Sequence, residues 1–231
     1  MRPDIHSQQI RLLRAVAFLA AVVALLLSSP QANAADAAET FVETRIEAGQ
    51  AILKDPLLAV DRRHRQFRDF LLSITDMRRV ALFTVGPYAR GASEPDIASF
   101  VTAFTEFLVS FYERVLDSYA GQTIRVTGSA RRSEDDAIVN AEVVEPGGKI
   151  PPLKVAFRVR KNDGGDSVLT DLQVEGAWLA LNQRAEFMSF LQQHRGDIAQ
   201  LSQELERRAR ANHSLVSRNE PSIGHPTQAA N

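Results

Sequence analysis

The stretch IASFVTAFTEFLVSFYERVLDSY, residues 97–119, decides the fold of this chain. Its apolar side chains recur at steps of three and four residues, which is the spacing of one face of an α-helix. They are Ile97, Phe100, Val101, Phe104, Phe107, Leu108, Phe111, Tyr112, Val115, Leu116 and Tyr119. The spacing predicts a long helix whose aromatic face lies against the protein's own core or against a cavity for an apolar ligand.

Three shorter helices are expected before this one, from their apolar spacing and from the residues that start or stop a helix. They cover residues 41–55, 61–74 and 76–85. Pro56 ends the first helix, because proline disfavours helical geometry at the residue before it. Asp61 is expected to cap the second helix. Ser93 and Asp96 predict a capping box at the start of the long helix.

From residue 122 onward, apolar and polar residues alternate with a period of two, which is typical of β-strands. The clearest alternation places Val155, Phe157 and Val159 on one face of a half-buried strand. Four antiparallel strands are expected, one from residue 122 and three over residues 138–145, 154–160 and 168–175. The inward side chains of the last strand are expected to be Val168, Leu172 and Val174.

The C-terminal part of the chain returns to helical spacing. One helix is expected to start near Trp178 and to end near His194, and a charged helix follows with Ile198, Leu201 and Leu205 on its apolar face. The order of helices, a four-stranded meander and more helices predicts an α+β fold, in which a small antiparallel sheet packs with a helical subdomain.

The N-terminus predicts export from the cytoplasm. A segment with three arginines precedes the apolar run of residues 15–27, and small residues at 32–34 form a cleavage signal. The apolar run is shorter than the roughly 20 residues that a membrane-spanning helix needs. We therefore expect a cleaved signal peptide over residues 1–34, one domain over residues 35–211, and a disordered tail over residues 212–231.

The composition indicates the cellular compartment of the protein and bears on its class of binding partner. The 231 residues contain no cysteine, so an exported chain must fold without disulfides, which favours a bacterial periplasm. Removing residues 1–34 takes three of the 27 basic and one of the 28 acidic residues, which leaves 24 against 27 and a net charge of −3. This charge gives no reason to expect a nucleic-acid partner.

Motifs for catalysis or metal binding are missing from the sequence. The histidines are His6, His64, His194, His213 and His225, and none forms a His-x-x-x-His pair. No Gly-x-Ser-x-Gly elbow is present, and the Gly-Gly-Lys at 147–149 lacks the spacing of a phosphate loop. The acidic run 134–136 is interpreted as a solvated turn, because aspartate is a common turn residue. We expect no catalytic residue, metal or cofactor, and a binding protein rather than an enzyme.

Three segments together suggest a known family. They are FTVGPYAR at 83–90, the aromatic helix at 100–119 followed by Ala-Gly, and DLQVEGAWL at 171–179 followed by NQRAEF at 182–187. In this order after a signal peptide, they resemble the MlaC or toluene-tolerance family of periplasmic phospholipid-binding proteins. The likeness spans residues 38–208, and its most specific part is the segment 171–187.

The resemblance implies a small cystatin-like sheet that clasps helices around a deep apolar lipid pocket. It also implies a monomeric shuttle that carries phospholipid between an outer-membrane lipoprotein complex and an inner-membrane ABC transporter complex with a lipid-binding, membrane-anchored subunit. This pathway maintains outer-membrane lipid asymmetry. The chain has Pro87 and Ala89 where the family often has arginine and tryptophan, and a related branch is linked to hopanoid biosynthesis. A hopanoid or another apolar lipid is therefore an alternative cargo.

Periodicity and motif position predict which residues wall this pocket. The sheet residues are Val126, Val139, Val143, Val155, Phe157, Val159, Leu172 and Val174, and the helix residues are Phe104, Phe107, Leu108 and Phe111. Tyr88, Arg90 and Trp178 are expected near an entrance. Two other classes of protein stay open, an envelope adaptor with a fully packed core and a hydrolase of envelope lipids, although the latter lacks a nucleophile and base pair.

Overall fold

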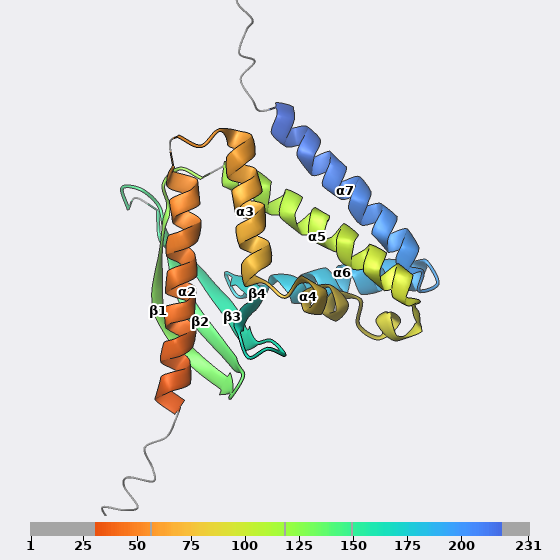
Figure 1. The fold of residues 1–231 in the computed structure, drawn as a ribbon, viewed down its shortest axis with the longest axis horizontal. Coiled ribbons are helices and arrows are strands. Elements are labelled where there is room, and N and C mark those ends of the chain that lie inside the picture. The colour runs from red at the N-terminus through yellow and green to blue at the C-terminus, as the bar shows by residue number, and fades with distance from the viewer. Residues whose placement is uncertain (1–30, 56, 118, 149, 219–231) are drawn as a thin grey trace, which may run out of the picture.

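The computed structural model of the protein describes residues 31–55, 57–117, 119–148 and 150–218 (Figure 1). Residues 1–30, which hold most of the predicted signal peptide, and residues 219–231 of the predicted tail lie outside the described residues. Among the helices of the described ranges, none is long and apolar enough to span a bilayer.

The chain has an α+β fold, with helices arranged around one antiparallel sheet. The helices are α2 (Gln31–Lys54), α3 (Val60–Ile74), α4 (Met77–Val85), the 3-10 helix η1 (Gly86–Gly91), α5 (Glu94–Asp117), α6 (Leu179–Gln193) and α7 (Ile198–Arg218). The strands are β1 (Thr123–Ser133), β2 (Asp136–Val144), β3 (Leu153–Lys161), β4 (Ser167–Val174) and β5 (Ala177–Trp178). Because α7 continues to Arg218, residues 212–218 are helical and do not belong to a disordered tail.

The N-termini of α5 and α3 test the two predicted helix caps. The Ser93 hydroxyl accepts a hydrogen bond from the Asp96 backbone N–H, so the N-cap half of the predicted capping box is confirmed, and the Asp96 carboxylate accepts from the Ser93 hydroxyl. The cap predicted for α3 is wrong, because Ala59 occupies the N-cap position without a side-chain bond. Asp61 lies instead in the first turn, where a negative charge favours the helix dipole.

The sheet contains five strands in the order β1-β2-β3-β4-β5, and each strand is antiparallel to its neighbour. The fifth strand was not expected. It exists because Glu175 and Gly176 adopt positive φ angles of 46° and 85°, which is the geometry of a tight two-residue hairpin turn. Trp178 therefore ends a strand before α6 begins, whereas the sequence predicted only a helix there.

The pairing register assigns each side chain to one of two faces, because directly opposed residues point the same way. The inner face carries the row Val126, Ala141, Val155 and Val174 and the row Val139, Phe157 and Leu172. The opposite, outer face carries Asn140, Ala156 and Gln173. All eight predicted sheet residues of the pocket thus share the inner face.

A bulge in β4 corrects one expected inward residue. Arg158 pairs with Asp171, but the next residue, Val159, pairs with Leu169, so Thr170 is an extra residue in β4. The bulge moves Leu169 to the inner face and Val168 to the outer face, where Val168 pairs with Arg160.

Two separate apolar cores hold these elements. In the first, α2 lies across β1 and β2 (Figure 1), and its Ala38 and Val42 pack with Val139 and Val159 of the inner face. The second core lies within α4, α5, α6 and α7, and its fully buried side chains include Phe100, Phe104, Phe187, Leu191, Leu201 and Leu205. The sheet and the helical subdomain therefore have separate buried cores, and β4 contacts α3, α4 and α6 between them.

The Asp171 carboxylate joins the two parts. Its Oδ1 accepts hydrogen bonds from the backbone N–H groups of Leu172 in β4 and Ala180 in α6, both at 2.8 Å. Since Trp178 at the N-cap of α6 makes no side-chain cap, Asp171 satisfies a helix N–H from outside the helix. Burial raises the pKa of Asp171, and these hydrogen bonds favour its charged form.

Asp136 corrects the interpretation of the acidic run as a solvated turn. Only Glu134 and Asp135 form the turn, whereas Asp136 begins β2 and is buried. Arg158 donates to both of its carboxylate oxygens, at 3.0 and 2.6 Å. Although burial opposes ionisation, the hydrogen bonds and charge of Arg158 hold the pKa of Asp136 below its usual range.

Gly86 marks a close approach between α4 and α6. It has φ 55° and ψ −126°, and a Cβ at this position would lie 2.5 Å from the Arg184 guanidinium. That guanidinium donates to the Phe83 carbonyl and lies 5.0 Å from the centre of the Phe83 ring. The motifs at 83–90 and 182–187 are therefore two halves of one packing contact.

We expect Gly86→Ala to lower the free energy of unfolding by about 1–3 kcal/mol, because an L-residue is strained at this backbone conformation and its Cβ would displace Arg184. Urea denaturation followed by circular dichroism measures the change. Gly91→Ala in the same 3-10 helix is the matched control, since nothing lies within 4 Å of its Cβ position. Equal losses for the two variants would contradict this account.

Candidate functional site

The apolar face of α5 passes from a buried to an exposed environment along the helix. Phe100 and Phe104 are 0% and 2% exposed in the helical core, whereas Phe111 is 42% exposed. Phe107 and Leu108, between them, are half-buried at the edge of that core. The stripe is therefore core at Phe100 and Phe104, whereas Phe111, further along the helix, is exposed.

Phe104 is a core residue and not part of a pocket wall as predicted. Its ring centre lies 6.1 Å from that of Phe100 and 6.3 Å from that of Phe187, with an edge-to-face arrangement toward Phe187. The reason is that α6 supplies Phe187, which fills the space beside Phe104. Helical spacing alone could not show how far along α5 this partner helix reaches.

The inner face of the sheet also contains both buried and half-buried apolar side chains. Val139, Val155 and Val159 are buried, so these three predicted wall residues offer almost no surface to a ligand. Val139 and Val159 are covered by the side chains of α2. The other five predicted sheet residues are only half-buried, and they are Val126, Val143, Phe157, Leu172 and Val174.

Helix α3 bridges the sheet and α5. It contacts α2, β4 and α5, and only Ile74 of its side chains is described as buried. Phe67, Phe70 and Leu71 on its apolar face are half-buried. The sequence predicted that they face inward but did not link them to a binding site.

An ion pair fastens α3 to α5. Arg68 Nη1 lies 2.8 Å from Glu106 Oε2, and Arg68 Nη2 binds the other carboxylate oxygen. The hydrogen bond from Arg68 holds the pKa of Glu106 below its usual range. About two turns further along α5, burial raises the pKa of Glu113, and the charges of His213, His64 and Arg68 oppose this effect. Polar contacts therefore hold α3 in place where apolar packing is sparse.

Tyr112 places the C-terminal half of α5 near β4. Its ring is half-buried, and burial followed by the nearby negative charge of Asp171 raises the pKa of its hydroxyl group to about 12. Phe111 packs edge-to-face against it, with the ring centres 5.5 Å apart. The sequence marked Tyr112 as part of the apolar stripe but not as a residue of the site.

These elements define a candidate apolar site of half-buried and exposed side chains. Its members are Phe67, Phe70 and Leu71 of α3, Phe107, Leu108, Phe111 and Tyr112 of α5, and Val126, Val143, Phe157, Leu172 and Val174 of the sheet. The chemistry of this set is that of a hydrocarbon-binding surface. Among the described residues, no group of three or more histidine, cysteine or acidic side chains is arranged to hold a metal.

The three predicted entrance residues lie elsewhere. Tyr88 packs at the edge of the helical core, where its ring would be 3.0 Å from a Cβ at Gly196. Arg90 is exposed on η1, next to the N-terminal end of α5, whereas the open half of the stripe is at the other end. Trp178 pairs with Gln173, so the register places it on the outer face of the sheet.

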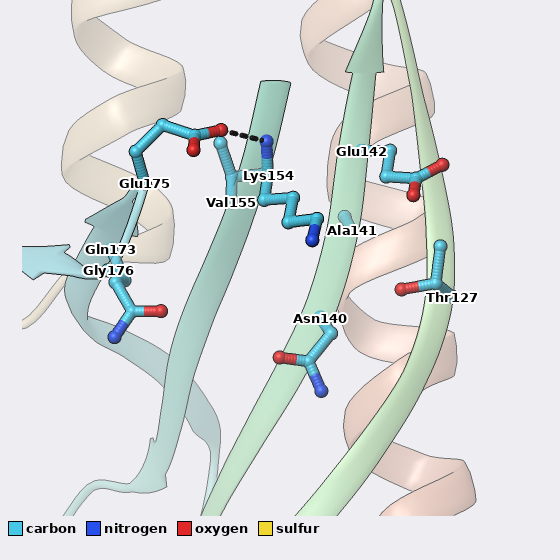
Figure 2. Close-up of a pocket in the computed structure, with 9 residues that line it drawn as sticks. All are labelled: Thr127, Asn140, Ala141, Glu142, Lys154, Val155, Gln173, Glu175 and Gly176. Atoms are coloured by element: carbon cyan, nitrogen blue, oxygen red, sulfur yellow. Dashed lines mark hydrogen bonds between the residues drawn. The ribbon is translucent and has the colours of Figure 1, made fainter. Parts of the chain in front are cut away.

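A polar hollow of about 390 Å³ lies over the sheet between β1 and β4. Figure 2 shows Asn140, Lys154 and Gln173 projecting from neighbouring strands, and the Lys154 backbone N–H donates to Glu175 Oε1 at 2.7 Å. Placing amide, ammonium and carboxylate groups against hydrocarbon costs free energy, because they lose their hydrogen bonds to water. This hollow is therefore chemically unlike the candidate apolar site.

We expect Phe104→Ala to lower the free energy of unfolding by about 3–5 kcal/mol, because it leaves a cavity in a closed core. Phe111→Ala should lower it by no more than about 1 kcal/mol, since much of that ring is exposed in the folded state. Both values follow from urea denaturation of each variant. Similar losses for the two phenylalanines would show that the division of the stripe is wrong.

The pKa of Tyr112 predicts an alkaline loss of stability. In the unfolded chain the phenol ionises near its ordinary pKa of 10.0, while in the folded protein it stays protonated to about 12. The free energy of unfolding should therefore fall between these two pH values by about 2 kcal/mol. Tyr112→Phe removes the group, so this part of the fall should be missing from its pH profile. If the stability of both proteins falls equally between these pH values, the pKa of Tyr112 is not raised in the folded protein.

Comparison with known proteins agrees with this architecture. The family model described as MlaC protein matches residues 43–207. No curated protein matches the sequence. A solved structure of a phospholipid-binding protein from Ralstonia solanacearum, in complex with a phospholipid, is similar with a TM-score of 0.66. It is 22% identical, and the similarity covers 76% of this chain and 98% of that one. The chain belongs to the MlaC protein family.

Proposed function

We propose that the protein is a periplasmic lipid carrier that buries the acyl chains of a phospholipid in the candidate apolar site. The observation that carries this proposal is the division of the α5 stripe, in which Phe111 is exposed while Phe104 is in a closed core. The apolar stripe of α5 thus continues past the closed core to the exposed Phe111 and the half-buried Tyr112. The half-buried residues of α3 and the inner sheet face supply the other walls.

The physical need for a carrier follows from the hydrophobic effect. Burial of hydrocarbon is favourable by about 0.8 kcal/mol for each methylene, so a 16-carbon chain represents on the order of 12 kcal/mol. A free lipid therefore crosses an aqueous compartment slowly unless a protein covers its chains. Binding of this kind needs no covalent step, which agrees with a sequence that offers no nucleophile and base pair.

Membership of the MlaC family and the phospholipid bound to the R. solanacearum protein support phospholipid as the cargo. The predicted signal peptide supports a periplasmic location. The full proposal is a monomeric shuttle between an outer-membrane lipoprotein complex and an inner-membrane ABC transporter complex. A hopanoid is the alternative cargo, since the candidate apolar site has apolar walls and does not require a particular head group.

An envelope adaptor with a packed core is a second candidate, favoured by the burial of Phe104, Val139 and Val159. Purification of the mature protein under mild conditions, followed by mass spectrometry of extracted lipid, separates the two. The carrier should yield phospholipid at close to one molecule per protein. A protein that holds no lipid and takes none from vesicles would support the adaptor.

Two neighbouring residues of β4 provide a matched pair for locating the site. Leu172 is on the inner face and Gln173 on the outer face. Leu172→Glu should lower lipid retention at least tenfold, because a buried carboxylate next to hydrocarbon is unfavourable, whereas Gln173→Glu should retain lipid normally. Leu172→Trp, which fills the site without adding charge, should also lower retention and checks that misfolding is not the cause. Normal retention in both Leu172 variants would place the lipid elsewhere.

A further inference from the structure

Exposed apolar side chains gather at one end of the molecule. Seven large apolar side chains of the described residues are exposed, and four of them belong to two connections. Leu57 and Val60 lie at the α2–α3 connection, where Leu57 is 92% exposed. Ile150, which is 61% exposed, and Leu153 lie at the β2–β3 connection.

Hydrogen bonds bring these two connections to the same end. Gln50 near the end of α2 donates to the Gln122 carbonyl at 3.5 Å, and the Gln122 side chain donates to the Glu145 carboxylate at 3.1 Å. Glu145 directly follows β2. Figure 1 shows the α2–α3 connection and the β2–β3 connection at the upper end of the view. We call residues 54–55, 57–65, 145–148 and 150–154 together the tip.

The tip carries positive charge on a chain with a net charge of −1. Its cations are Lys54, Arg62, Arg63, Arg65 and Lys154, and its anions are Asp55, Asp61 and Glu145. Five cations against three anions give a net charge of +2 for the tip. Lys54, Arg62, Arg65 and Lys154 are exposed.

One cation of the tip shapes the α2–α3 connection. Arg63 Nη2 donates to the carbonyl oxygens of Asp55 and Leu58, at 3.3 Å each. The backbone N–H of Leu57 donates to the Asp55 carboxylate at 2.9 Å. These bonds fix a turn at which the Leu57 side chain points into solvent. Its exposure is therefore a property of the folded connection.

We propose that the tip docks on a lipid bilayer that contains anionic phospholipids. Exposed aliphatic side chains at connections enter the head-group region, and neighbouring cations are attracted to the negative surface. A protein partner fits less well, because protein interfaces are enriched in aromatic residues and the four exposed side chains of the tip are aliphatic. This docking goes beyond carrying a lipid, since a protein can bind a membrane surface with or without cargo.

The direction of the α5 stripe agrees with docking at this end. Phe111, in the C-terminal half of α5, is exposed, and the chain continues from α5 through Gln122 into β1. The open part of the candidate apolar site therefore lies on the side of the molecule that would face the bilayer. Docking would shorten the path that an acyl chain takes through water.

Vesicle flotation with the purified protein tests the proposal. Vesicles of phosphatidylglycerol mixed with phosphatidylcholine should bind the protein, and vesicles of phosphatidylcholine alone should bind it at least tenfold less. Leu57→Asp combined with Ile150→Asp should lower binding to the mixed vesicles at least tenfold. Arg62→Gln combined with Arg65→Gln should lower it about thirtyfold, and added salt should have the same effect on the unaltered protein.

Leu181→Asp is the matched control, because Leu181 is exposed on α6 outside the tip. It should bind vesicles as the unaltered protein does. Absence of binding to mixed vesicles, or equal binding by all variants, would overturn the proposal and would favour a protein partner for the tip. Lipid that co-purifies with the tip variants reports on the carrier function separately, so either proposal can fail without the other.

Discussion

The position of α6 against the sheet depends on Asp171, which adds a hydrogen bond to the packing of α3, α4 and α6 on β4. One carboxylate oxygen accepts a backbone N–H from β4 and another from the first turn of α6. The bond to α6, the Thr75–Leu169 bridge and the bond from Arg79 to the Lys161 carbonyl join the sheet to the helical subdomain. Between them, the side chains of α5, α3 and the inner sheet face stay incompletely covered, and this incomplete burial is what produces the candidate apolar site.

The sequence predicted the helices, the main strands and the inner face of the sheet correctly. The reason is that the spacing of apolar residues depends directly on which face of a helix or strand is buried. The eight inward sheet residues share one face in the pairing register. It did not predict β5 or the position of Val168. Both depend on backbone geometry at single residues, namely the positive φ angles of Glu175 and Gly176 and the extra residue Thr170.

The candidate site was predicted less well, because a periodic pattern does not distinguish a side chain that touches protein from one that touches a ligand. Phe104 and Phe111 have the same place in the helical repeat, yet Phe187 from a distant segment covers only Phe104. The entrance residues were assigned by motif position. Tyr88 lies against Gly196 in the structure, so packing accounts for the aromatic residue at this position of the motif.

The attachment of α3 has a consequence for dynamics. Most of its described apolar side chains are half-buried, and it is fastened to α5 by the Arg68–Glu106 ion pair. Local opening requires least free energy where few apolar contacts are lost, and the contribution of a partly exposed ion pair weakens with ionic strength. Amide hydrogens of α3 are therefore expected to exchange with solvent faster than those of α5, so the candidate apolar site would open to solvent on the side of α3.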